Sequence, residues 1–338
     1  MLTFTQIFSQ QSAISWLQQA YAADRLPHGL IFAGLTGVGK ATTARALAAL
    51  LLCENPNQTT PCGSCHSCTA LNANTHPDYH VVTKELIRYH DKTGKSKGTE
   101  LSINVVRYEI VEPAGHKSVM GRAKIFAIEQ ADLMTHQAQN ALLKTLEEPY
   151  GRTAIILLTD SPGSLLATIR SRCQTLRFQP LPTEVVEQQL IQRNIDPALA
   201  HQAAELTHGS LGTALKWIED GVISPAADLA AQIDAAFEGT PPPDLPTWLK
   251  KAAEHYAEKQ LERDELSSKD QATREALTLY FLIAADRARH RLATAESPEE
   301  LERACAIIDS IARAENYLDS NVNTGLVLQQ LAIALEPR

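Results

Sequence analysis

No stretch of the sequence approaches the roughly 18 uninterrupted apolar residues that a membrane-spanning helix needs. Residues 1–11 lack the basic segment followed by an apolar run that marks a secretory signal. A surplus of positive charge is missing too, because 31 Lys and Arg stand against 39 Asp and Glu and leave a net charge of −8. We therefore expect a cytoplasmic protein with no membrane contact and without a large basic surface of its own for nucleic acid.

The composition is that of a folded protein, with 44% hydrophobic and 21% charged residues in 338 positions, enough for two or three domains. In the first half, short apolar runs alternate with helical patterns, which predicts a parallel α/β sheet. We expect buried strands at residues 30–33, 124–128 and 154–158. Residues 40–52 are expected to form one helix, and a second should end at Pro149.

Strand patterns disappear after Gly221, and the rest of the chain predicts helices. Ser297-Pro298-Glu299-Glu300 has the cap, proline and glutamate of a helix start. The expected domains are residues 1–180 (α/β), 181–220 (small and helical) and 221–338 (all-helical). Residues 83–101 are interpreted as a solvated loop inserted in the first domain, and residues 240–246 as a stiff connector.

A phosphate-binding loop is predicted at Gly34-Leu-Thr-Gly37-Val-Gly39-Lys40, which follows a strand and opens a helix. Its glycines would let backbone N–H groups surround phosphates while Lys40 reaches the terminal oxygens. The alternative is a glycine-rich turn that binds nothing.

Two groups that ATP hydrolysis needs are missing from this predicted site. Ala41 replaces the Ser or Thr that holds Mg²⁺. The strand at 124–128, expected to neighbour the loop strand, is followed by Glu129-Gln130 instead of Asp-Glu. A neutral amide such as that of Gln130 cannot act as a base. We therefore expect no intrinsic ATPase activity, while Lys40 leaves nucleotide binding open.

Four of the six cysteines lie within sixteen residues, at positions Cys53, Cys62, Cys65 and Cys68. This spacing predicts one tetrahedral Zn²⁺ with a structural role, because four protein ligands leave no position for water. Unconnected or disulfide-linked cysteines are the alternative. His66 is expected to be exposed, and Cys305 to lie in a helical core.

Several segments together resemble the delta-prime subunits of bacterial DNA polymerase III clamp loaders, which are AAA+ proteins. These segments are Pro27–Gly34, the cysteines followed by His76-Pro77-Asp78-Tyr79, Asn140–Pro149 and Ser171-Arg172-Cys173. The resemblance covers residues 5–220, and the tail only by architecture. It implies an AAA+ P-loop domain with the zinc module, a small helical lid and a C-terminal all-α collar domain.

The resemblance also implies roles for single residues. Arg172 would act as an arginine finger in the ATP site of an adjacent subunit, where a guanidinium forks onto phosphate oxygens. The alternative is that it caps a helix or pairs with a nearby acid. Thr159 stands at the family's sensor position, and the alternative is that it caps the following turn.

The implied function is that of a non-hydrolysing stator in the DNA polymerase III holoenzyme. Its partners would be the ATPase motor subunits and the clamp-opening delta subunit of a hetero-pentamer, which acts on the sliding clamp and primer-template DNA. An active motor subunit is one alternative, but Ala41, Glu129-Gln130 and Gly212 depart from the motor pattern. Another is a zinc-knuckle DNA-binding module, in which nearby basic residues grip phosphates; these are Lys84, Arg88, Lys92, Lys95 and Lys97.

Overall fold

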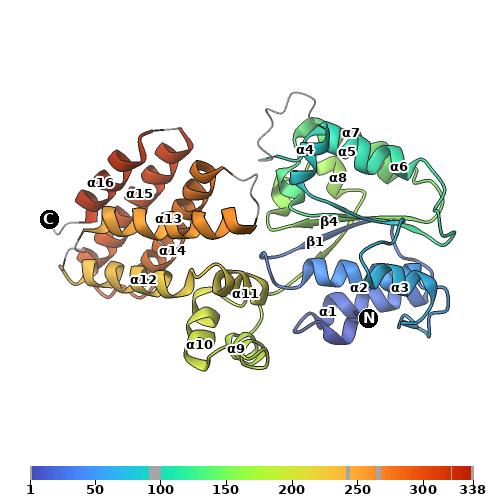
Figure 1. Ribbon diagram of the computed structural model, residues 1–338, viewed down its shortest axis with the longest axis horizontal. Coiled ribbons are helices and arrows are strands. Elements are labelled where there is room, and N and C mark those ends of the chain that lie inside the picture. The colour runs from blue at the N-terminus through green and yellow to red at the C-terminus, as the bar shows by residue number, and fades with distance from the viewer. Residues whose placement is uncertain (1, 91–99, 241–243, 264–267, 321, 336–338) are drawn as a thin grey trace. The chain divides into compact units, whose positions relative to one another are not determined.

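A computed structural model describes residues 2–90, 100–240, 244–263, 268–320 and 322–335 (Figure 1). Contacts within the chain divide it into two compact units. Unit 1 comprises residues 1–186 and 208–213, and unit 2 comprises residues 187–207 and 214–338. Each unit has its own hydrophobic core. None of the described helices is both long and apolar enough to cross a membrane.

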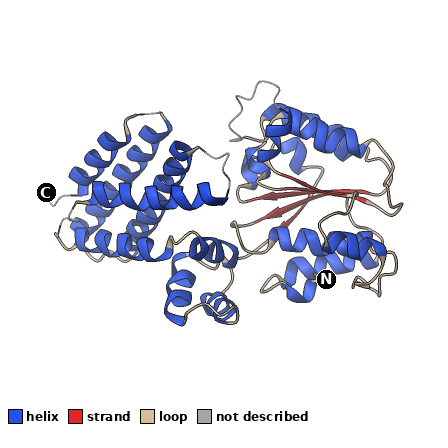
Figure 2. Ribbon diagram, in the orientation of Figure 1, coloured by secondary structure: helices blue, strands red, loops and turns tan. Residues whose placement is uncertain are grey.

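Unit 1 is built on a parallel sheet with the strand order β2-β3-β4-β1-β5 (Figure 2). The strands are β1 (Gly29–Ala33), β2 (Tyr79–Val82), β3 (Lys124–Ile128), β4 (Thr153–Thr159) and β5 (Gln174–Arg177). Strands β1, β3 and β4 are buried along their whole length, as expected of a parallel sheet covered on both faces, and the sequence predicts all three. The fold class is the predicted α/β P-loop type.

Helices cover both faces of this sheet (Figure 1). On one face lie α1 (Gln11–Ala22), α2 (Lys40–Leu52) and α3 (His66–Asn72). On the other lie α4 (Ile87–His90), α5 (Ile103–Val106), α6 (Glu112–Ala114), α7 (His136–Glu147) and α8 (Ala167–Arg170). Phe126, Leu142 and Ile155 are fully buried in the core of this second face.

The prediction of a solvated loop at residues 83–101 is wrong for the part of this segment that the structure describes. Lys84–Leu86 forms a 3-10 turn that leads into α4. Ile87 is only 4% exposed and Leu101 is fully buried, because both join the core of unit 1. Residues 91–99, with three of the five basic residues of the DNA-binding alternative, lie outside the described part of the chain.

After β5 the described chain is helical, as predicted (Figure 2). The helices are α9 (Thr183–Ile191), α10 (Pro197–Leu206), α11 (Leu211–Glu219), α12 (Ile223–Phe237), α13 (Leu245–Arg263), α14 (Lys269–Ala293), α15 (Pro298–Asp319) and α16 (Thr324–Leu335). The predicted start of α15 is confirmed, because the Ser297 hydroxyl accepts a hydrogen bond of 3.2 Å from the N–H of Glu300.

Two expectations for the second half are wrong. Cys305 is exposed, because the buried face of α15 includes Ala304, Ile307 and Ile311, and one residue along a helix turns the side chain by about 100°. The connector expected at 240–246 ends early, since α13 already begins at Leu245, while residues 241–243 lie outside the described part.

Candidate functional site

The residues predicted for a nucleotide site gather at the carboxyl edge of the sheet, where such sites form in parallel α/β folds. The phosphate loop leaves β1, Thr159 ends β4 and Glu129 follows β3. A backbone hydrogen bond of 3.1 Å from Gly34 N–H to Thr159 O ties the loop to β4. Because β4 lies between β1 and β3, the expectation that Glu129 follows the strand next to the loop is wrong.

The loop ends at Gly39, which has a left-handed backbone (φ 103°) and caps the first turn of α2. Lys40 follows and is only 7% exposed. Its ammonium group donates to the carbonyl oxygen of Leu35 at 2.9 Å and also to that of Gly34. The buried ammonium group is therefore turned back into the loop.

The ammonium group of Lys40 also pairs with the carboxylate of Asp160, at 2.6 Å from Oδ1. The other oxygen of Asp160 accepts hydrogen bonds from the Thr36 N–H, at 3.1 Å, and from the Thr36 hydroxyl. Sequence reasoning missed Asp160, although its position directly after Thr159 at the end of β4 is a usable signal. A carboxylate that belongs to the chain itself thus accepts hydrogen bonds from three donors of the phosphate loop.

Residues 208–213 pack against the same loop. The Ser210 hydroxyl donates to Thr36 O at 2.6 Å, and the Gly212 N–H donates to Gly37 O at 2.9 Å. Gly37 has φ 79°, and a Cβ built there would lie 2.2 Å from Ser210 Oγ. Glycine is therefore required at position 37 both for its backbone angle and for this close approach.

Four described residues bear on whether this site could hold Mg²⁺ and activate water. Ala41 offers no hydroxyl, and the hydroxyl of Thr43 donates within α2 to Gly39 O at 2.8 Å. Burial, together with the negative charge of Glu85, raises the pKa of Glu129, so this carboxyl ionises less readily than usual. Gln130 is exposed and remains a neutral amide.

Thr159 is 1% exposed, and its hydroxyl has two partners. It donates to Asp132 Oδ1 at 2.8 Å and accepts from the Ser161 N–H at 3.0 Å. The second bond caps the turn after β4, which is the alternative interpretation of this residue. Thr159 thereby fixes the segment that carries Asp160.

Four cysteine sulfur atoms converge at the end of α2 and the start of α3. The sulfurs of Cys53, Cys62, Cys65 and Cys68 all lie within 4.8 Å of one another, and those of Cys62 and Cys68 are 3.9 Å apart. Thiolates bound to a tetrahedral Zn²⁺ at about 2.3 Å stand about 3.8 Å from each other. The cluster therefore has the ligand set and spacing for one such ion.

Backbone N–H groups already favour the thiolate form at one position. Those of Ser64 and Cys65 lower the pKa of Cys62 to about 6. Burial raises the pKa of Cys53 and that of Cys68, and a bound cation would favour the thiolate form of both. His66 is exposed, as predicted.

The His76-Pro77-Asp78-Tyr79 segment ties the cysteine module to the sheet. His76 Nε2 lies 3.0 Å from the hydroxyl of Ser67 on α3, and its Nδ1 accepts from the Asp78 N–H at 3.1 Å. Asp78 is completely buried and accepts hydrogen bonds from the N–H groups of Val119 and Met120, at 2.7 and 2.8 Å. These contacts hold α3 and the segment before β3 against β2.

Arg172 lies between α8 and β5, with 35% of its side chain exposed. Its Nε donates to the Glu147 carboxylate at 2.7 Å, and Nη1 donates to Thr168 O at 3.0 Å. In the chain alone, Arg172 therefore pairs with a nearby acid, as in the alternative interpretation. An exposed pair of this kind is weak enough to exchange for another anion.

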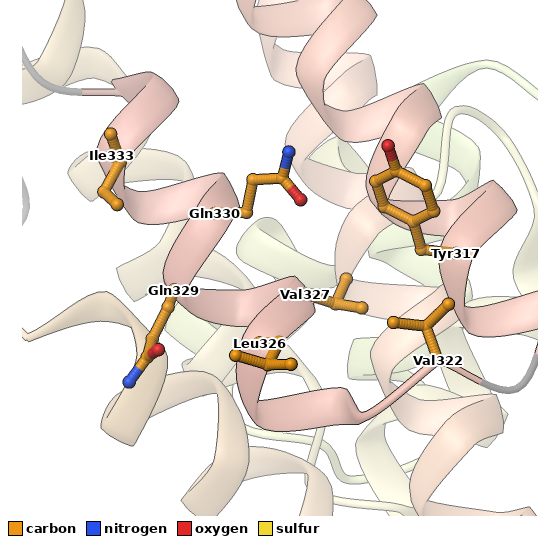
Figure 3. A pocket seen from close by; sticks show the side chains of 7 residues that line it. All are labelled: Tyr317, Val322, Leu326, Val327, Gln329, Gln330 and Ile333. Carbon is orange, nitrogen blue, oxygen red and sulfur yellow. The ribbon is translucent and has the colours of Figure 1, made fainter.

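Unit 2 carries an open apolar pocket of 430 Å³ between the end of α15 and α16 (Figure 3). Val327, which is 1% exposed, forms part of its floor. Leu326 and Ile333 are 62% and 68% exposed and also line it. Apolar side chains this exposed are typical of contact surfaces when they cluster.

Comparison with known proteins identifies the family. A family model described as DNA polymerase III, delta subunit, matches residues 9–182, just over half of the chain. The DNA polymerase III subunit delta' of Bacillus subtilis is 34% identical over 200 residues, covering 59% of this chain and 56% of that protein. The subunit delta' of Escherichia coli is 38% identical over 202 residues, covering 59% and 57%. The subunit tau of Escherichia coli is 28% identical over 244 residues, covering 70% and 36%.

The chain thus spans little more than half the length of the two delta' relatives. The region that matches the family model contains the phosphate loop, the four cysteines and Arg172. The chain belongs to the DNA polymerase III delta subunit family, as its resemblance to the delta-prime subunits predicts.

Proposed function

We propose that this chain is a clamp-loader subunit of the DNA polymerase III holoenzyme that does not hydrolyse ATP and lends Arg172 to the ATP site of a neighbouring subunit. The observation that carries the proposal is the state of its own phosphate loop. Lys40 is paired with Asp160, and Ala41 and Gln130 stand where metal binding and base chemistry are needed. Identity to delta' relatives, at 34–38%, also exceeds the 28% identity to the tau subunit.

Arg172 suits a role in trans because it is partly exposed and, within the described part of the chain, its charged partner is the half-exposed Glu147. A finger of this kind accelerates phosphoryl transfer about 10³- to 10⁵-fold at the site that it enters. We therefore expect Arg172→Ala to leave assembly intact and to remove that site's share of the complex's DNA-stimulated ATPase activity.

The test is steady-state ATPase of the reconstituted loader, with Arg170→Ala as the matched control. Arg170 is an exposed arginine two residues away, at the end of α8. An unchanged rate in the Arg172→Ala complex would rule out the finger. The alternative, an active motor subunit, requires ATP hydrolysis by the purified chain alone, and a rate typical of loader motors would refute the proposal altogether.

We also propose that the four clustered cysteines bind one structural Zn²⁺, supported by the sulfur spacing and by four protein ligands that leave no open position. Metal analysis of the purified chain should give one equivalent of zinc. Cys68→Ser should lose the metal and destabilise unit 1. Cys305→Ser, at an exposed cysteine on α15, should keep the metal and leave the stability of unit 1 unchanged. A full zinc equivalent in the Cys68→Ser variant would refute the site.

The partners that we propose are motor subunits and a clamp-opening delta subunit in a hetero-pentamer, which contacts the sliding clamp and primer-template DNA. We retain the division into residues 1–180, a lid at 181–220 and a collar at 221–338 as part of this proposal. Support for the collar comes from the exposed apolar side chains of α15 and α16, including Leu326 and Ile333.

A further inference from the structure

The phosphate loop presents its donors to an anion that belongs to the chain itself. Lys40 Nζ, the Thr36 N–H and the Thr36 hydroxyl all contact the carboxylate of Asp160. A backbone N–H of the loop and its lysine are the groups that would otherwise contact phosphate oxygens. Asp160 therefore occupies donors that a polyphosphate group would need.

The rest of the loop is held in the same closed arrangement. Ser210 and Gly212 donate to the carbonyl oxygens of Thr36 and Gly37, at 2.6 and 2.9 Å. Lys40 is 8% exposed at its side chain, whereas 44% of the Asp160 side chain is exposed. The carboxylate thus lies at the open side of the loop, between the buried ammonium group and solvent.

Charge decides which anion the loop can accept. A phosphate oxygen that approached Lys40 would meet the negative charge of Asp160 at close range, and like charges held close together repel each other. Removal of that charge would leave the glycines, the helix start and Lys40 in place. The loop retains the parts for binding phosphate but is blocked by one side chain.

We infer that Asp160 is an internal anion that closes a latent site for the polyphosphate group of a nucleotide, and that loss of its charge opens the site. This role of Asp160 in the chain's own loop does not depend on whether Arg172 acts in trans.

The variant that tests it is Asp160→Asn, which keeps the shape and an oxygen acceptor for the Thr36 N–H but removes the charge. Asp24→Asn is the matched control, because Asp24 is also an exposed carboxylate in an ion pair, with Arg152 at the amino end of β4. Inorganic pyrophosphate and ATP, each without magnesium, serve as separate probes in calorimetric titrations of the full chain. Comparison of the two probes separates recognition of the phosphates from recognition of the nucleoside.

We expect Asp160→Asn to bind pyrophosphate about tenfold or more tightly than the unchanged chain, since a like charge is gone. Asp24→Asn should bind as the unchanged chain does, and Lys40→Met added to Asp160→Asn should abolish the gain. Equal affinity in the unchanged chain and in Asp160→Asn would overturn the inference, and so would a gain that survives Lys40→Met.

Folding of each variant is checked by circular dichroism, and Asp160→Ser, which also removes the charge, replaces Asp160→Asn if the amide does not fold. Titration of the unchanged chain with pyrophosphate is a second, independent test. Micromolar pyrophosphate binding that Lys40→Met removes would mean that the carboxylate does not block the loop. A gain with ATP alone would also overturn the inference, because it would place recognition on the nucleoside.

Discussion

Replacement of the buried Asp78 by Asn should destabilise unit 1 strongly. One carboxylate oxygen accepts from Val119 N–H at 2.7 Å and the other from Met120 N–H at 2.8 Å. Asparagine keeps one acceptor and turns an NH₂ group toward the other N–H. One charge-assisted hydrogen bond is lost, at about 1.5–3 kcal/mol, and an N–H that faces the buried side chain is left unpaired, at about 1–3 kcal/mol. The expected loss of unfolding free energy is about 3–5 kcal/mol.

The assay is equilibrium denaturation of the full chain at fixed zinc concentration and under reducing conditions. Because the chain has two units, the transition of each must be followed separately, for example by hydrogen exchange of residues in β3 and in α14. Thermal melts should show the same effect as a decrease of about 2–4 °C per kcal/mol for a unit of this size. The transition of unit 2 should not move.

Asp24→Asn is again the control, since its pair with Arg152 is exposed and should contribute less than about 1 kcal/mol. A loss below about 1 kcal/mol in Asp78→Asn would refute the reasoning, because it would mean that the two N–H groups find other partners at little cost. The same outcome would remove Asp78 as the anchor of the segment before β3.

Two further predictions concern unit 2. Glutamate at both Leu326 and Ile333 should prevent copurification with motor subunits. The melting temperature should stay within about 1 °C, since substitutions at exposed positions rarely change stability. Retained copurification would count against this surface as a subunit contact. Burial acts to raise the pKa of Asp234, but hydrogen bonds and charges from Arg287 and Arg291 outweigh it and lower that pKa. Its stabilising contribution is therefore present above the usual carboxyl pKa of about 4 and lost as the pH falls below it, and denaturation curves between about pH 6 and 3 should show a smaller decline in Asp234→Asn.

The sequence predicts the buried part of the sheet better than its edges. Strands β1, β3 and β4 are apolar runs because both of their faces are covered, and burial of both faces leaves a clear pattern. Strands β2 and β5 lie at the two edges of the sheet, and most of their side chains are at least partly exposed. Neither strand therefore forms a continuous apolar run, and the sequence analysis missed both.

The same limit applies to the site. The loop glycines and Lys40 are adjacent in sequence and follow a known spacing, so the motif predicts them. Asp160 and Ser210 reach the loop from 120 and 174 positions away from their partners, and only the folded chain brings them there. The sequence predicts that hydrolysis is absent, but it does not predict the contact between Asp160 and Lys40.

The carboxylate of Asp160 also stabilises the phosphate loop from within the chain. A buried ammonium group without a counter-charge is costly, so a phosphate loop with an ordinary lysine depends on a bound anion for part of its stability. In this chain Asp160 supplies the counter-charge at 2.6 Å from Lys40, and residues 208–213 are bonded to the loop at the same time. These contacts hold the loop through groups of the chain itself. Under the proposed function, a loop held in this way would give Arg172 a support whose position does not depend on a nucleotide bound to this chain.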